Sequence, residues 1–145
     1  MANCGVEVFD KTLQKTMIWI DEICEEAGTD NKGVGYKILR ASLLALRNRL
    51  TQNEAIHLGD QLPMLIRGIY YEGWSPSESP SKIRDKDEFI KQVNGFLRTE
   101  LPFDTEKGVR SVFKVMRKHV TEGEIKDVQD ILPSEIKPLI SFCGG

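Results

Sequence analysis

The sequence is short of the residue patterns that mark most enzyme and metal sites. Its three cysteines (Cys4, Cys24 and Cys143) stand at unrelated spacings, and its only histidines are His57 and His119. Structural zinc sites use closely spaced cysteine and histidine pairs, and secreted disulfide frameworks use an even number of cysteines. No glycine-rich phosphate loop or nucleophile elbow occurs either. We therefore expect no metal site, no cofactor, no catalytic residues, and a reducing cytoplasmic location.

The chain also lacks a charge imbalance and long apolar runs. Its net charge is −2, with 8 positive and 10 negative side chains in residues 1–74 and 12 of each in residues 75–145. Domains that bind nucleic acid usually carry a marked basic excess. The longest apolar runs, such as residues 17–20 and 43–46, are far too short to span a bilayer. We therefore expect neither membrane insertion nor nucleic-acid binding.

What the sequence does contain is a repeat. Residues 39–72 align with residues 109–142 at a constant offset of 70, and eight of the 34 pairs are identical. Chance at ordinary composition gives roughly two to three identities. The identical pairs are Arg40/Arg110, Arg47/Arg117, Thr51/Thr121, Glu54/Glu124, Asp60/Asp130, Leu62/Leu132, Pro63/Pro133 and Ile66/Ile136. They fall at predicted helix caps, turns and core positions, which favours an internal duplication.

Apolar residues recur at steps of three and four, the spacing of a helix with one buried face. A first helix is predicted from after Asp10 to about Ala27. A fourth is predicted from Pro63 to about Tyr71, because proline suits a first helical turn. Residues expected to face inward include Leu13, Met17, Ile20, Leu65, Ile66 and Ile69 in the first half, and Ile136, Leu139 and Ile140 in a last helix opened by Pro133.

Two capping boxes open equivalent short helices. In each, the threonine hydroxyl of Thr51 or Thr121 is expected to accept from the backbone N–H three residues on. The glutamate at that position, Glu54 or Glu124, is expected to reach back to the threonine N–H. Asp85 and Asp104 are the predicted caps of two further helices.

These signals predict an all-α fold of about eight helices in two related units of about four each. The first unit covers residues 9–74 and the second covers residues 85–142. A linker rich in proline and serine, residues 75–84, separates them. No window alternates in the way a half-buried strand requires.

The run from Leu62 to Trp74, preceded by a helix rich in leucine and arginine and a threonine-capped turn, resembles a bacterial family of unknown function, DUF2267. The opening from Phe9 to Thr16 is similar to that family's usual start. The resemblance covers about residues 9–142. It implies a small, soluble, mostly helical bacterial protein, and it brings no reaction, substrate or catalytic residue.

The repeated arginines have two interpretations. Arg40 and Arg47, like Arg110 and Arg117, are seven residues apart and share one helix face. Four guanidiniums near a pseudo-twofold axis could bind an anion. Alternatively, Arg47 and Arg117 pair with Asp60 and Asp130 or cap the carbonyls of a neighbouring helix. The structural interpretation is favoured, because the aspartates recur together with the arginines.

Tyr70, Tyr71 and Trp74 form an aromatic group where the first unit meets the linker, and the second unit has no counterpart for Trp74. Tyrosine and tryptophan often anchor interfaces, so these residues are a candidate partner-binding surface. The alternative is that Trp74 folds back, closes the core and pins the linker.

The preferred functional hypothesis is a non-enzymatic helical interaction module that binds a protein partner or itself. The alternative hypothesis is a binder of small anions or nucleic acid that uses Arg40, Arg47, Arg110 and Arg117. The sequence offers no positive support for a third hypothesis, an enzyme with a site assembled from both halves.

Overall fold

A computed structural model describes residues 4–141, and within that range every regular element is a helix, as the sequence predicts. Cys143 and position 142, the last residue of the predicted second unit, lie outside the described residues. The elements are α1 (Glu7–Ala27), α2 (Lys32–Arg49), α3 (Gln52–Asp60), α4 (Met64–Tyr71), the 3-10 turn η1 (Pro76–Glu78), α5 (Lys86–Leu97), α6 (Thr105–His119), α7 (Glu122–Ile131) and α8 (Lys137–Ile140). No helix in this part of the chain is long and apolar enough to cross a membrane.

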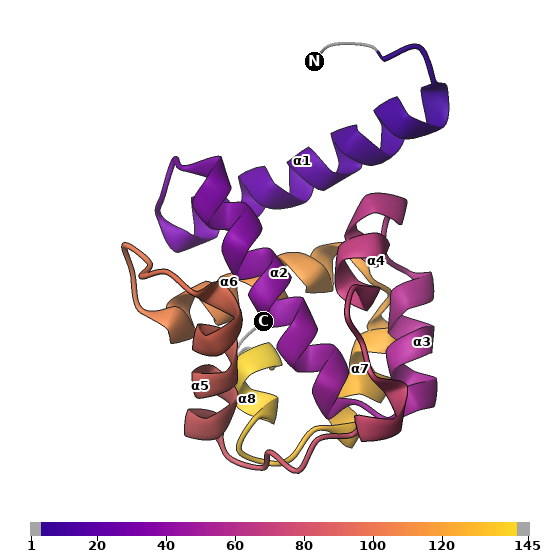
Figure 1. Ribbon diagram of the computed structural model, residues 1–145. Helices are drawn as coiled ribbons and strands as arrows, with labels where there is room; N and C mark the ends of the chain where they lie inside the picture. The colour runs from indigo at the N-terminus through magenta and orange to yellow at the C-terminus, as the bar shows by residue number, and fades with distance from the viewer. Residues whose placement is uncertain (1–3, 142–145) are drawn as a thin grey trace.

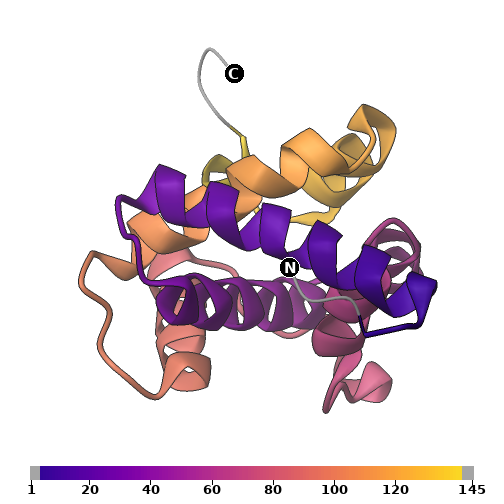
Figure 2. The same cartoon turned by 90° about the horizontal axis from the view of Figure 1, so that it is seen from above.

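Helix α2 runs through the middle of the molecule (Figure 1). It packs against α1, α4, α5 and α6, and the other close helix pairs include α1 with α6 and α3 with α7. Seen from above, α1 lies alongside both α2 and α6 (Figure 2). This arrangement brings α6 and α7, late in the sequence, against helices from the beginning of the chain.

One continuous apolar core fills the space between the helices. Its largest fully buried side chains include Trp19, Tyr70, Phe89 and Phe113. Gly108 allows α6 to approach α2 closely, since a Cβ at this position would lie 2.7 Å from the Ile38 side chain. Burial of this aromatic and aliphatic surface supplies most of the stabilisation of the fold.

Several helix ends share one geometry at positions 70 residues apart. Gly28 and Arg98, which follow α1 and α5, both adopt the left-handed conformation, and their N–H groups donate to Cys24 O and Asn94 O. The hydroxyls of Thr51 and Thr121 both accept from the N–H three residues on, as the capping boxes predict.

The first helix begins earlier than predicted, and one residue on α1 and one on α4 do not face the core as predicted. It starts at Glu7 after Val6, and the carboxylate of Asp10 accepts the N–H of Cys4. Leu13 is 39% exposed and Leu65 is 40% exposed, so the prediction that both face inward was wrong. In Figure 1 the first turns of α1 extend past α2 and over α4.

The last helix is shorter than predicted, although its buried residues are as expected. Helix α8 begins only at Lys137, because Pro133 opens a turn in which the N–H groups of Ile136 and Lys137 donate to its carbonyl. Ile136, Leu139 and Ile140 are fully buried. At the start of α5 Asp85 caps with its side chain, whereas Asp104 precedes α6 without a side-chain hydrogen bond to it.

Candidate functional site

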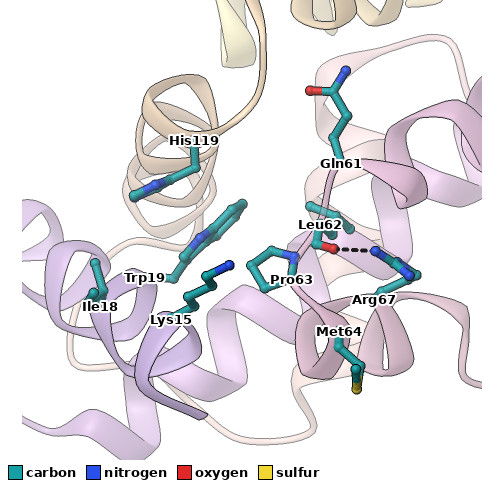
Figure 3. A pocket seen from close by; sticks show the side chains of 9 residues that line it. All are labelled: Lys15, Ile18, Trp19, Gln61, Leu62, Pro63, Met64, Arg67 and His119. Atoms are coloured by element: carbon teal, nitrogen blue, oxygen red, sulfur yellow. Dashed lines mark hydrogen bonds between the residues drawn. The ribbon is translucent and has the colours of Figure 1, made fainter. Parts of the chain in front are cut away.

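A cleft of about 460 Å³ opens between α1, the corner that joins α3 to α4, and the end of α6 (Figure 3). Its size is in the range of sites that bind small molecules or peptide side chains. Both apolar and cationic side chains line it, from three separate stretches of the chain.

The α1 side of the cleft is built on an aromatic stack. The rings of Trp19 and His119 lie with centroids 5.0 Å apart at an angle of 21°. Trp19 is almost completely buried. The Nε2 of His119 lies 2.6 Å from Glu22, which orients the imidazole and balances its charge when it is protonated.

The opposite wall is the α3–α4 corner, and Arg67 fixes its shape. Its guanidinium donates to the carbonyls of Gly59 and Leu62, at 2.9 and 3.0 Å, where α3 ends. Gln61 then ties this corner to α7, since its amide donates to the Thr121 hydroxyl and its carbonyl accepts the Thr121 N–H. These hydrogen bonds hold the wall in place.

Two cations of the cleft lack carboxylate partners. Lys15 extends under Trp19 with its ammonium group directed toward Pro63 (Figure 3). Neither Lys15 nor Arg67 forms an ion pair with any residue between positions 4 and 141. Ile18 and Met64 add exposed apolar surface at the rim, at 46% and 49% exposure. The cleft therefore suits a ligand with both acidic and apolar groups.

A second cluster lies where α3 contacts α7. One ligand atom each from Glu54, His57 and Glu124 lies within 4.8 Å of the other two. Both glutamates are only 8% exposed, and the Oε2 atom of each is buried without a hydrogen-bond partner. His57 lies at the exposed edge of the cluster. Neither carboxylate forms an ion pair with a residue that the structure describes.

The electrostatics of this cluster oppose ionisation. Burial, the adjacent Glu54 carboxylate and the charges of Asp127 and Asp60 raise the pKa of Glu124 to about 8. Tyr70 closes the cluster from the core side: burial and neighbouring charges, those of both glutamates among them, raise the pKa of its phenol. The Tyr70 hydroxyl donates to Ala55 O at 2.7 Å and is already used.

The glutamate half of each predicted capping box is therefore wrong. The Thr121 N–H, which Glu124 was expected to bind, donates to Gln61 at 2.9 Å. Glu54 and Glu124 instead place their Oε2 atoms in a buried contact between two helices. The threonine hydroxyls cap the helix starts as the motif predicts. The position of each glutamate carboxylate is set by the packing of α3 on α7.

The structure places the four repeated arginines against backbone carbonyls. Arg47 donates to Tyr70 O at 2.8 Å and to Glu72 O at 2.7 Å, at the end of α4. Arg117 donates to Ile140 O at the end of α8. The remaining contacts are Arg40 with Phe96 O, and Arg110 with Pro138 O and the Glu106 carboxylate.

These contacts do not bring the four guanidiniums together in one site. Arg110 lines a surface hollow with Glu26 and Lys114, and Arg117 lines a different one with Glu122. Asp130 accepts from Lys126, its neighbour one turn earlier on α7.

The three aromatic residues are largely engaged within the molecule. Tyr70 is fully buried, and Tyr71 stacks on Trp74 with ring centroids 5.7 Å apart. The indole N–H of Trp74 donates to Ser79, whose hydroxyl donates to Arg47 O. Trp74 thus holds the linker against α2, and Tyr70 offers no exposed surface to a partner.

Sequence reasoning did not single out His57, Lys15, Trp19 or Arg67. For His57 a signal exists: a glutamate followed three residues later by a histidine, on one helix face, is a ligand spacing found in metal-binding bundles. For the cleft there is no such signal, because its residues come from three distant stretches.

Comparison with known proteins identifies a family. No curated protein sequence matches the chain. The model of a family described as an uncharacterized conserved protein, DUF2267, matches residues 16–139. That range covers most of the chain, so the protein belongs to the DUF2267 family.

Proposed function

We propose that this protein is a helical interaction module whose cleft binds an acidic, partly apolar segment of a protein partner. The observation that carries the proposal is that two cations without carboxylate partners lie beside apolar walls. Lys15 and Arg67 face the cleft without carboxylate partners, beside the buried ring of Trp19. An acidic side chain placed there would form ion pairs while its apolar neighbours cover Ile18 and Met64.

Rigidity supports the same function. Arg67 and Gln61 fix the α3–α4 corner by hydrogen bonds, and the Trp19–His119 stack fixes the α1 side. A preformed cleft loses little conformational entropy on binding, which favours affinity. The site that we propose therefore lies at the cleft rather than at Tyr70, Tyr71 and Trp74.

We further propose that the chain arose by duplication of a four-helix unit. Contacts at a constant offset of 70 support this: Arg47 with Tyr70 O matches Arg117 with Ile140 O, and the left-handed caps at Gly28 and Arg98 match. The cleft itself contains Trp19, whose equivalent in the second unit is the buried Phe89.

A cytoplasmic setting remains part of this proposal. The thiols of Cys4 and Cys24 are free, which is compatible with a reducing compartment.

The test is a titration of the full-length protein with two matched synthetic peptides. One alternates leucine with aspartate and glutamate, and the other carries lysine at every acidic position. Binding is followed by NMR through the indole N–H of Trp19. We expect only the acidic peptide to bind, and Lys15→Glu to weaken it at least about tenfold, since each lost charge contact at an interface changes affinity by this order.

Lys11→Glu is the control, because Lys11 lies one turn earlier on α1 and pairs with Glu7 outside the cleft. This variant should bind the acidic peptide nearly as tightly as the wild type. Equal binding of both peptides, or equal loss in Lys11→Glu and Lys15→Glu, would overturn the proposal. So would a dimer that occupies the cleft with a second copy of the chain.

A further inference from the structure

We infer that Glu54, Glu124 and His57 form a site for a first-row divalent transition-metal ion that joins α3 to α7. The three side chains come from the two helices, and their ligand atoms lie within 4.8 Å of one another. The inference is independent of the cleft and of any peptide partner.

The buried oxygens are what separate this cluster from an ordinary acidic patch. Each glutamate is more than nine-tenths buried, and the Oε2 atoms of Glu54 and Glu124 have no hydrogen-bond partner. A buried carboxylate oxygen without a partner is strongly unfavourable. A cation between the two carboxylates would satisfy both oxygens at once.

A shared proton is the competing explanation. One proton between Glu54 and Glu124 would lower the repulsion, as in other close carboxyl pairs. Such a proton would join one oxygen of each group, as a cation would, but it gives the adjacent imidazole of His57 no role. The His57 ring makes no hydrogen bond to any residue in the described range 4–141, so its nitrogens are available for coordination.

The geometry suits an ion of this size once the ligand atoms move closer together. Carboxylate oxygens and imidazole nitrogens lie about 2.0–2.2 Å from zinc, so two ligands at a tetrahedral angle are about 3.3–3.6 Å apart. The ligand atoms here lie within 4.8 Å of one another, so they approach by at most about 1.5 Å on binding. The exposed His57 side chain can make this movement by a change of rotamer.

The donor set selects the class of metal. Two carboxylates with one imidazole favour ions such as Zn²⁺, Mn²⁺, Fe²⁺ or Co²⁺, whereas Mg²⁺ and Ca²⁺ prefer oxygen ligands alone. Three protein ligands leave at least one coordination position for water on the exposed side of His57.

The experiment uses the full-length protein after treatment with a chelator. Zn²⁺, Mn²⁺, Co²⁺, Mg²⁺ and Ca²⁺ are added separately at about pH 8, where the carboxylates of a metal site can ionise. Calorimetry gives stoichiometry and affinity, thermal unfolding gives stability, and the visible spectrum of Co²⁺ reports its ligands. We expect one equivalent of Zn²⁺ or Co²⁺ to bind. At a concentration one hundred times Kd, binding should raise Tm by roughly 9 °C.

Glu54→Gln and Glu124→Gln preserve side-chain shape, and each should weaken Zn²⁺ binding at least about 100-fold. His57→Gln should weaken Zn²⁺ binding about 10- to 100-fold and change the Co²⁺ spectrum. The matched controls are Glu122→Gln, which removes an exposed carboxylate from the first turn of α7, and His119→Gln, which removes the other histidine. Both controls should bind as the wild type does.

Two results would overturn the inference. One is the absence of stoichiometric binding by any of the three transition metals. The other is binding that Glu54→Gln and Glu124→Gln leave unchanged, which would place the ion elsewhere. Both glutamine variants relieve buried charge, so they should fold, and circular dichroism of the metal-free proteins checks this.

Discussion

Carboxylates have basic partners at one helix contact of this molecule and an acidic partner at another. The first contact joins α1 to α6, and the second joins α3 to α7. Where α1 meets α6, acidic side chains face basic ones: Glu22 contacts Lys118 and His119, and Glu26 contacts Lys114 at 2.9 Å. Where α3 meets α7, Glu54 faces Glu124, with both carboxylates buried. The carboxylates of the first contact have partners of opposite charge. At the second contact, the buried Oε2 atoms of Glu54 and Glu124 have no hydrogen-bond partner.

The carboxyl pKa values at the two contacts shift in opposite directions, as this difference in partners predicts. Burial opposes ionisation of Glu22, but the hydrogen bonds from His119 and Lys118 outweigh it and lower the pKa of that carboxyl. Burial and the Glu54 carboxylate raise the pKa of Glu124 to about 8. The charged side chains of α1 and α6 thus attract each other. The carboxylates of α3 and α7 repel each other unless a proton or a cation lies between them.

The largest effect is expected from breaking the α1–α6 contact at its apolar centre. Trp19→Ala should lower the free energy of unfolding by about 3–5 kcal/mol, because it removes a fully buried indole and the surface on which His119 stacks. Urea unfolding measures the loss. Ile18→Ala, at the exposed neighbouring position, should change stability by less than about 1 kcal/mol. Equal effects of the two substitutions would contradict the packing described.

A smaller effect of opposite sign is expected at the α3–α7 contact. In metal-free protein, Glu124→Gln should increase stability by roughly 1–2 kcal/mol at about pH 9, because the amide removes a buried charge beside Glu54. The raised pKa sets the pH dependence. Below the ordinary value of 4.5 the carboxyl is protonated in both states, and the wild type loses stability as pH rises from there to about 8.

The advantage of Glu124→Gln should therefore grow between these two pH values and then level off. Urea unfolding with a chelator at several pH values measures it, with Glu122→Gln as the control for loss of charge on α7. A destabilised Glu124→Gln variant at high pH would show that the Glu124 carboxylate is stabilised by its surroundings.

The smallest effect is expected from Glu22→Gln. This substitution should destabilise the protein by at most about 1 kcal/mol, because the ion pairs of Glu22 are partly exposed and screened by solvent. The pKa of Glu22 is lowered, so its contribution is present at neutral pH and is lost as pH falls below about 4.5. The effect should shrink in high salt. A loss that salt leaves unchanged would contradict an electrostatic origin.

Much of the fold could be predicted from local signals, because those signals act within one turn of helix. Thr51, Thr121 and Asp85 cap helices as predicted, since a side-chain oxygen and a backbone N–H three residues on need no other part of the chain. The prediction that Leu13 and Leu65 face inward was wrong, because the apolar face of a helix does not show which part of that face a neighbouring helix covers. The start of α8 was also mispredicted, because Pro133 opens a turn rather than the helix itself.

The candidate sites could be predicted only in part. Glu54 and Glu124 were found as a repeated pair, but the capping-box pattern assigns their carboxylates to the backbone. Only the packing of α3 on α7 shows that the two carboxylates meet. The cleft depended entirely on tertiary structure, since Lys15, Arg67 and His119 share no spacing that a sequence pattern could detect.

The most direct test of an incomplete α3–α7 contact is a crystal structure of the full-length protein grown with Zn²⁺, with anomalous differences recorded at the zinc edge. The account predicts one strong peak between the two helices, about 2.0–2.2 Å from a carboxylate oxygen of Glu54, one of Glu124 and an imidazole nitrogen of His57. A map with no peak there, in which Glu54 and Glu124 lie within hydrogen-bond distance of each other and His57 points to solvent, would contradict it. The contact would then be completed by a shared proton.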